Sequence, residues 1–126
     1  MIYIFSAFYA EAKNIIDHYG LKKEKSPEMV RFDVFANESI RLVITGVGEI
    51  NAAAAVSNIG GAYGISSDDE ILNVGCGAGF SSDICLGSIF LGNKLTEQMT
   101  GRTFYPDMLM KVNFRECEIV TVARVL

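Results

Sequence analysis

A carboxylate near the start of the chain can act as a general base. Glu11 follows an apolar run, Ile2 to Ala7, and stands in the first turn of a segment with helical spacing. A glutamate held there can take a proton from water or stabilise a positive charge that develops nearby. Alternatively, Glu11 only complements the dipole of its own helix. Spacing alone favours this second interpretation.

Two glycine-rich loops follow predicted strands, and both allow a ligand to approach the backbone. The first, Thr45 to Asn51, places two glycines around Val47, and the helix behind it offers free N–H groups to a polar ligand. It lacks the third glycine of a dinucleotide-binding loop, which disfavours dinucleotide binding. The second, Gly75 to Gly79, consists of five small residues. It forms either a flat wall for a planar ring or a tight turn in which glycine supplies positive φ.

Two further positions carry reactive or charged side chains. Cys76 lies in the second glycine loop, but the only histidine, His18, is far from it in the sequence. We therefore predict that Cys76 is a small buried residue and that His18 is a surface or half-buried residue of a helix. Arg102, in the segment Thr100 to Asp107, can hold a phosphate or a carboxylate, and its aromatic neighbours can stack on a base. The same segment is equally compatible with a surface turn.

The elements that must position these residues follow from the pattern of apolar residues. We expect strands at residues 2–7, 30–35, 40–45, 70–74, 89–95 and 119–125, and helices at residues 11–19 and 51–63. Strands that alternate with helices predict an α/β fold with a mixed, mostly parallel sheet and helices on its faces. The three loops then meet at the carboxyl edge of the sheet, where ligands bind in such folds.

We expect residues 1–126 to form a single, partial domain, apparently truncated. The chain ends on an apolar strand, Val120 to Leu126, and a parallel strand normally leads into a helix that covers the sheet. An uncovered edge and face of this kind favour pairing with another chain. We therefore expect a homo-oligomer, most simply a dimer.

The composition disfavours several classes of function. The 126 residues are 50% hydrophobic and 21% charged with a net charge of −4, and no concentrated basic patch is present to bind nucleic acid. No apolar stretch reaches the about 18 residues that a membrane-spanning helix needs. The N-terminus lacks the positive region of a signal peptide. The three cysteines show neither a disulfide framework nor a zinc motif, so a reducing cytoplasm is the expected compartment.

Three blocks of the sequence, in this order, resemble the nucleoside phosphorylase and nucleosidase superfamily. They are Ile4 to Glu11, Ile44 to Ala53 and Leu72 to Gly79. They are similar to the family's opening strand with its acidic residue, its glycine turn with an alanine-rich helix, and its Asn-x-Gly wall. The resemblance covers essentially the whole chain, but only about the first half of the family's domain. The best-known nucleosidases of the family cleave methylthioadenosine and adenosylhomocysteine.

The resemblance implies a purine nucleoside as the small-molecule ligand, and hydrolysis or phosphorolysis of its N-glycosidic bond as the reaction. It implies that Glu11 activates the attacking water. The residues that it assigns to the ribose and base pocket are Val47, Cys76, Gly77 and Ala78. Phosphate is a co-substrate only if the protein is a phosphorylase, with Arg102 as its candidate ligand, and no other cofactor or metal is implied.

Two departures from the family leave the substrate and the activity open. Ser6 stands where the family usually has glycine, and the wall reads Cys-Gly-Ala-Gly where the nucleosidases have Ser-Ala-Gly-Gly. The family's Met-Glu pair, which binds ribose, and its Asp, which protonates the purine, match nothing in these residues. We expect a nucleoside-cleaving enzyme, or a fragment of one that is inactive alone. The alternative is a non-catalytic remnant that keeps the fold as a nucleoside-binding or structural module.

Overall fold

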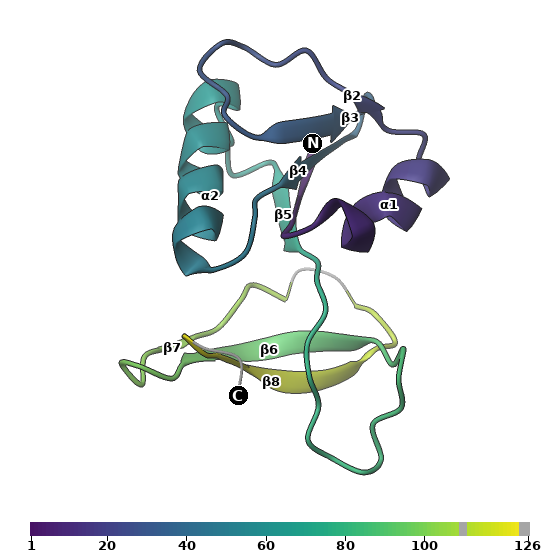
Figure 1. Cartoon of the computed structure of the whole chain (residues 1–126), viewed down its shortest axis with the longest axis vertical. Coiled ribbons are helices and arrows are strands. Elements are labelled where there is room, and N and C mark those ends of the chain that lie inside the picture. Colours follow the sequence, from purple (N-terminus) through teal and green to yellow (C-terminus); the bar gives the residue numbers. More distant parts are fainter. Residues whose placement is uncertain (109–110, 124–126) are drawn as a thin grey trace. The chain divides into compact units, whose positions relative to one another are not determined.

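The computed structural model describes residues 1–108 and 111–123. The chain divides into two compact units, Met1–Gly77 and Ala78–Leu126. The first unit is an α/β sheet with two helices, and the second is a small β-sheet (Figure 1). The single domain that we expect over residues 1–126 stays a prediction.

The first unit contains five strands and two helices. In chain order they are β1 Ile2–Ser6, α1 Tyr9–His18, β2 Lys22–Lys23, β3 Asp33–Ala36, β4 Ile40–Ile44, α2 Glu49–Tyr63 and β5 Glu70–Asn73. The strands form one sheet in the order β2-β3-β4-β1-β5. β1 runs parallel to both β4 and β5, whereas β2, β3 and β4 pair antiparallel. The sheet is therefore mixed, and its parallel part is the part that the three predicted loops follow.

The two helices cover opposite faces of this sheet, as Figure 1 shows. Successive side chains of a strand point to opposite faces, and β1 divides its apolar residues accordingly. The members of the core on the α2 side are Tyr3, Phe5, Val34, Val43, Ala55 and Ile59. The members of the core on the α1 side are Ile4, Ala12, Ile16, Leu21, Ile40 and Leu42. β1 and β4 are buried on both faces, and this makes their carboxyl ends rigid supports.

Two very short strands are absent from the sequence-based expectations. β2 covers only Lys22–Lys23, two exposed residues that read as a polar loop. It exists because it pairs with Phe35 and Ala36 at the end of β3. β7, Thr103–Phe104, exists in the same way through pairing with β6. Neither strand carries an apolar signal of its own, so only the tertiary pairing reveals them.

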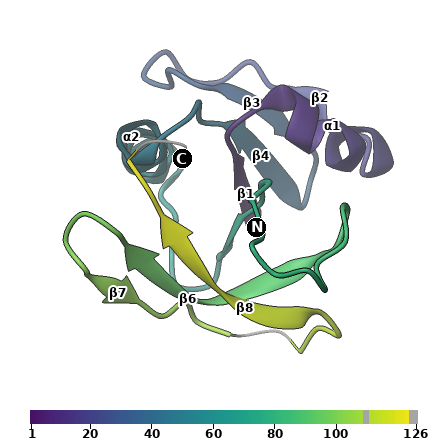
Figure 2. The same cartoon turned by 60° about the horizontal axis from the view of Figure 1, so that its bottom comes forward.

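The second unit is a three-stranded sheet in the order β7-β6-β8. Figure 2 shows β6, Phe90–Glu97, beside β8, Arg115–Thr121, and the two strands run parallel. A Cβ atom at Gly92 would lie 2.5 Å from Cδ1 of Ile119, so the end of this exposed side chain would have to move to admit one. β8 begins four residues before the predicted strand 119–125, and the predicted positions 124 and 125 lie outside the described residues.

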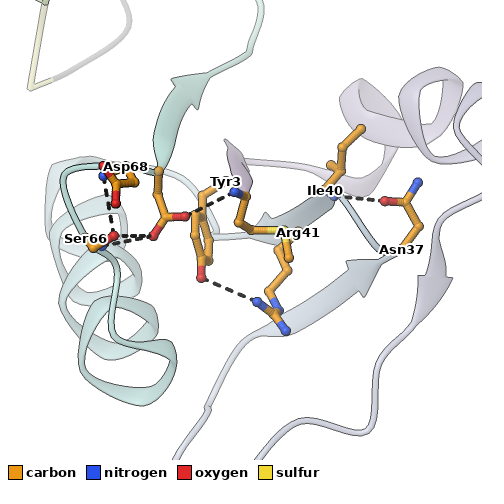
Figure 3. Close-up of polar contacts among 8 residues, drawn as sticks. Tyr3, Asn37, Ile40, Arg41, Ser66 and Asp68 are labelled. Carbon is orange, nitrogen blue, oxygen red and sulfur yellow. Dashed lines mark hydrogen bonds and ion pairs between the residues drawn. The ribbon is translucent and has the colours of Figure 1, made fainter.

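Several polar contacts lie near the amino ends of the parallel strands in the first unit (Figure 3). Arg41 Nη1 donates to the hydroxyl of Tyr3 at 3.4 Å. The carboxylate of Asp69 accepts from the backbone N–H of Ser66 at 2.9 Å, and its other oxygen lies 3.1 Å from the ammonium group of Met1. The Ser66 hydrogen bond, followed by the Met1 ammonium, lowers the pKa of Asp69 below its ordinary value.

We expect Asp69→Asn to lower the free energy of unfolding at pH 7 but to have little effect in strong acid. The pKa of Asp69 is lower in the folded state than its unfolded value of about 3.9. Its stabilising contribution is therefore complete above that value and disappears as the pH falls through the lowered pKa. Urea unfolding of both proteins from pH 7 to pH 2 measures the difference. Asp68→Asn, at an exposed neighbour, is the control, and a pH-independent Asp69→Asn effect would contradict the ionic origin.

Candidate active site at the carboxyl ends of the parallel strands

The three predicted loops meet at one edge of the sheet of the first unit. β1 lies between β4 and β5 and is parallel to both, so the three carboxyl ends are adjacent. Backbone hydrogen bonds continue past the strands: Gly46 N donates to Ala7 O at 3.1 Å, and Val74 N donates to Phe5 O at 2.9 Å. The prediction that the loops share one edge is confirmed.

The carboxylate of Glu11 lies between the loops that follow β1 and β5. Its Oε1 accepts from the backbone N–H of Cys76 at 3.2 Å. Its Oε2 accepts from the hydroxyl of Ser6 at 3.4 Å. Glu11 is half-buried and stands in the first turn of α1. Because both oxygens have partners outside α1, a contact with the helix dipole does not account for the position of this carboxylate.

The loop between β4 and α2 has the geometry that its glycines allow. Gly46 and Gly48 have φ values of 82° and 98°, in the region that favours glycine. Gly48 is also the N-cap of α2 and has no side chain with which to cap it, so the first N–H groups of the helix keep their donors open. Val47, between the glycines, is 60% exposed. The loop therefore presents an apolar side chain and free backbone donors at the same edge as Glu11.

We expect Gly46→Ala to lower the free energy of unfolding by about 1–2 kcal/mol, because alanine is strained at this positive φ. The new Cβ would also lie 3.2 Å from Nδ2 of Asn51. Gly61→Ala is the matched control, since position 61 lies inside α2 with open space around its Cα. Alanine there should raise stability by about 0.5–1 kcal/mol. Thermal unfolding of the two variants measures both effects, and equal shifts would contradict the strain at Gly46.

The loop after β5 provides backbone and small residues. Gly75 and Gly77 are exposed, and neither has a positive φ, so the tight-turn interpretation does not apply to them. A Cβ at Gly75 would be 3.7 Å from Oε2 of Glu11, so the glycine leaves room beside the carboxylate. The prediction that Cys76 is buried is wrong, because the chain has left the sheet there. Cys76 donates its backbone N–H to the carboxylate of Glu11, and its thiol is exposed.

The remaining predicted residues are described unit by unit. Ala78 and Arg102 belong to the second unit, and their roles stay predictions. Arg102 is exposed next to the start of β7, and its carbonyl accepts from the N–H of Glu97 at 2.9 Å. His18 is exposed at the end of α1, as predicted. Within residues 1–108 and 111–123 no cluster of His, Cys, Asp or Glu side chains could hold a metal ion. None of the helices in the described part of the chain is long and apolar enough to span a bilayer.

Sequence reasoning missed the two groups that hold the Glu11 carboxylate. In the sequence Ser6 is only a departure from the family's glycine, and the backbone N–H of Cys76 carries no sequence signal. A polar residue as the last residue of an otherwise apolar strand, five positions before a glutamate, is the only available hint of the first contact.

No protein-family model and no curated protein sequence matches the chain. Solved structures do match it. The 5′-methylthioadenosine/S-adenosylhomocysteine nucleosidase of Neisseria meningitidis, in complex with methylthio-immucillin-A, superimposes with a TM-score of 0.77 at 16% identity over 98% of this chain. A futalosine hydrolase mutant of Helicobacter pylori gives 0.80 at 12% identity over 99%. The chain has the nucleosidase fold.

The nucleosidase fold is matched over part of each relative's length. The chain spans 64% of the Neisseria nucleosidase and 69% of the Helicobacter hydrolase. The S-adenosylhomocysteine nucleosidase of Streptococcus pyogenes, in complex with 5-methylthiotubericidin, gives a TM-score of 0.73 at 17% identity, over 95% of this chain and 61% of that one. The resemblance in the sequence blocks and the likeness in three dimensions therefore agree on the fold.

Proposed function

We propose that this chain supplies the water-activating part of a site that hydrolyses the N-glycosidic bond of a purine nucleoside. Glu11 is the general base. The observation that carries the proposal is the position of its carboxylate, held by one group from the end of β1 and one from the loop after β5, at the carboxyl edge of a nucleosidase fold. In folds of this kind ligands bind at that edge.

Hydrolysis of an N-glycosidic bond requires a carboxylate close to C1′ of the sugar. When the bond between C1′ of the sugar and the base nitrogen breaks, its electron pair leaves with the base and the sugar becomes positively charged. Glu11 stabilises this charge and accepts a proton from the water that attacks C1′. The departing base needs a proton from an acid, which the resemblance assigns to an Asp that matches no residue of this chain. Val47, Cys76 and Gly77, which are exposed in the loops at the edge that holds Glu11, are the proposed lining of the pocket.

The contacts of the two arginines in the first unit bear on the choice between hydrolysis and phosphorolysis. A phosphorylase binds phosphate, which arginine recognises best. Arg31 Nη1 donates to the carbonyl of Glu28 at 2.6 Å, in the loop before β3. Arg41 stands opposite Tyr3 near the amino ends of β4 and β1, and its guanidinium stacks at 4.1 Å on the ring of Tyr63. Arg41 is thus engaged away from the carboxyl edge that holds Glu11, which favours hydrolysis, whereas Arg31 lies two residues before Asp33, which pairs with Ile44 at the carboxyl end of β4.

The test is a titration of the isotope-labelled 126-residue chain with adenosine and with methylthioadenosine, followed by NMR. We expect weak binding, with a dissociation constant above about 0.1 mM, because one unit provides few contacts. The first amide signals to move should be those of residues 46–48 and 75–77, with or without phosphate. Base release by the chain alone should stay at background.

Three outcomes would count against this proposal or part of it. Signals that move only at the amino ends of the strands would place the ligand elsewhere. No movement at millimolar nucleoside would support the structural remnant. Binding that requires phosphate would favour a phosphorylase, with Arg102 then the first residue to mutate.

A further inference from the structure

The hydroxyl group of Ser6 lies within hydrogen-bond reach of the carboxylate of Glu11. We propose that Ser6 is a positioning residue, whose hydroxyl orients the Glu11 carboxylate for proton transfer. This inference rests on the proposed function for its purpose, but the contact itself can be tested without catalysis. Ser6 is 1% exposed, and its hydroxyl lies 3.4 Å from Oε2 of Glu11.

The backbone of Ser6 is fixed from the β4 side. As the last residue of β1, it pairs in register with Ile44 of β4, and its carbonyl accepts from the N–H of Thr45 at 2.9 Å. A serine side chain has a single rotatable heavy-atom bond, so a fixed backbone leaves its hydroxyl few positions. A hydroxyl that is buried needs a hydrogen-bond partner, and the carboxylate of Glu11 is within reach.

The two contacts of Glu11 together define the plane of its carboxylate. Ser6 donates to Oε2 from the end of β1, and the N–H of Cys76 donates to Oε1 from the loop after β5. A glutamate side chain is otherwise free to rotate about three bonds, and a general base has to be held in reach of the proton that it accepts. With one donor on each oxygen, the remaining lone pairs are directed to fixed places. The distance of 3.4 Å is at the long end of the range for a hydroxyl donor.

The experiment uses the 126-residue chain and the amide of Cys76 as the reporter. Glu11→Ala removes the acceptor and should increase hydrogen exchange at this amide most. Ser6→Ala should increase it by about 2- to 10-fold, the range for one lost hydrogen bond. The control is Ser57→Ala, at an exposed serine of α2, which should leave the exchange rate unchanged.

A spectroscopic readout separates positioning from a general loss of packing. Glu11→Ala should move the amide proton signal of Cys76 from its wild-type position, and Ser6→Ala should move it in the same direction by a smaller amount. If Ser6→Ala does not fold, the pair Ser6→Thr and Ser6→Val replaces it, because the two side chains have the same shape and only threonine keeps the hydroxyl. Threonine should preserve the wild-type behaviour and valine should not.

Two results would overturn the inference. One is an unchanged Cys76 exchange rate in Ser6→Ala together with a raised rate in Glu11→Ala. The other is identical behaviour of the threonine and valine variants. Because none of these readouts involves base release, a protein that binds no nucleoside would refute the proposed function and leave the Ser6 result to be judged separately.

Discussion

Glu11→Gln is expected to lower kcat for base release by about 100-fold or more, the usual scale for the loss of a general base. Glutamine keeps the size of glutamate, and its carbonyl oxygen can still accept from the N–H of Cys76 while its NH2 group donates to the hydroxyl oxygen of Ser6, but it cannot take a proton from water. The fold should therefore persist while the reaction slows. The measurement needs a longer form of the protein that carries the rest of the site, such as a fusion to the part of the Neisseria nucleosidase that has no counterpart here.

Glu49 provides a matched control for this substitution. It is also a glutamate in the first turn of a helix, α2, and it is exposed. If a first-turn glutamate acted only on its helix dipole, Glu11→Gln and Glu49→Gln would both cost under about 1 kcal/mol of stability and leave kcat alone. A wild-type kcat in the Glu11 variant would make Glu11 a structural residue and remove the main support for the proposed function.

Ile59→Ala is expected to lower the free energy of unfolding by about 2–5 kcal/mol. Ile59 is 0% exposed in the core between α2 and the sheet, together with Phe5 and Val43. Alanine removes buried methyl groups and leaves a cavity that strands on a rigid sheet cannot close. A loss of this size is a large part of the total stability of a small domain.

The same helix contains the control. Ile50 stands in the first turn of α2 and is 87% exposed, so Ile50→Ala removes little buried surface and should change stability by less than about 0.5 kcal/mol. Urea unfolding of both variants under identical conditions gives the comparison. Equal losses at the two positions would mean that α2 does not pack on the sheet through the face that carries Ile59.

The sequence predicts those parts of the fold that carry their own local signal. β1 and β4 are short apolar runs, and the alanines of α2 favour a helix, so these elements lie within about two residues of the expected positions. The shared loop edge follows from parallel strands alone. The strand Lys22–Lys23 could not be predicted, because only its partner in the sheet makes it a strand.

The candidate site also has features that the sequence predicts and features that depend on the tertiary structure. The importance of Glu11 and of the glycine loops comes from residue type and order. The exposure of Cys76 depends on where the chain leaves the sheet after β5, and residue type gives the wrong answer there. The contact between Ser6 and Glu11 depends on the direction in which α1 leaves β1, and no local pattern specifies that direction.

The central place of β1 in its sheet has a consequence for folding. Ile2 stands opposite Ile40 on one side and Glu70 on the other, so both neighbours of the first strand come from much later in the chain. Pairings between such distant segments close large loops and slow the folding of a domain. The hydroxyl that ends β1 is only five residues from Glu11, but the amide that follows β5 can meet the carboxylate of α1 only after β1 and β5 have paired. Completion of the site is therefore a late event that waits for the last strand of this sheet.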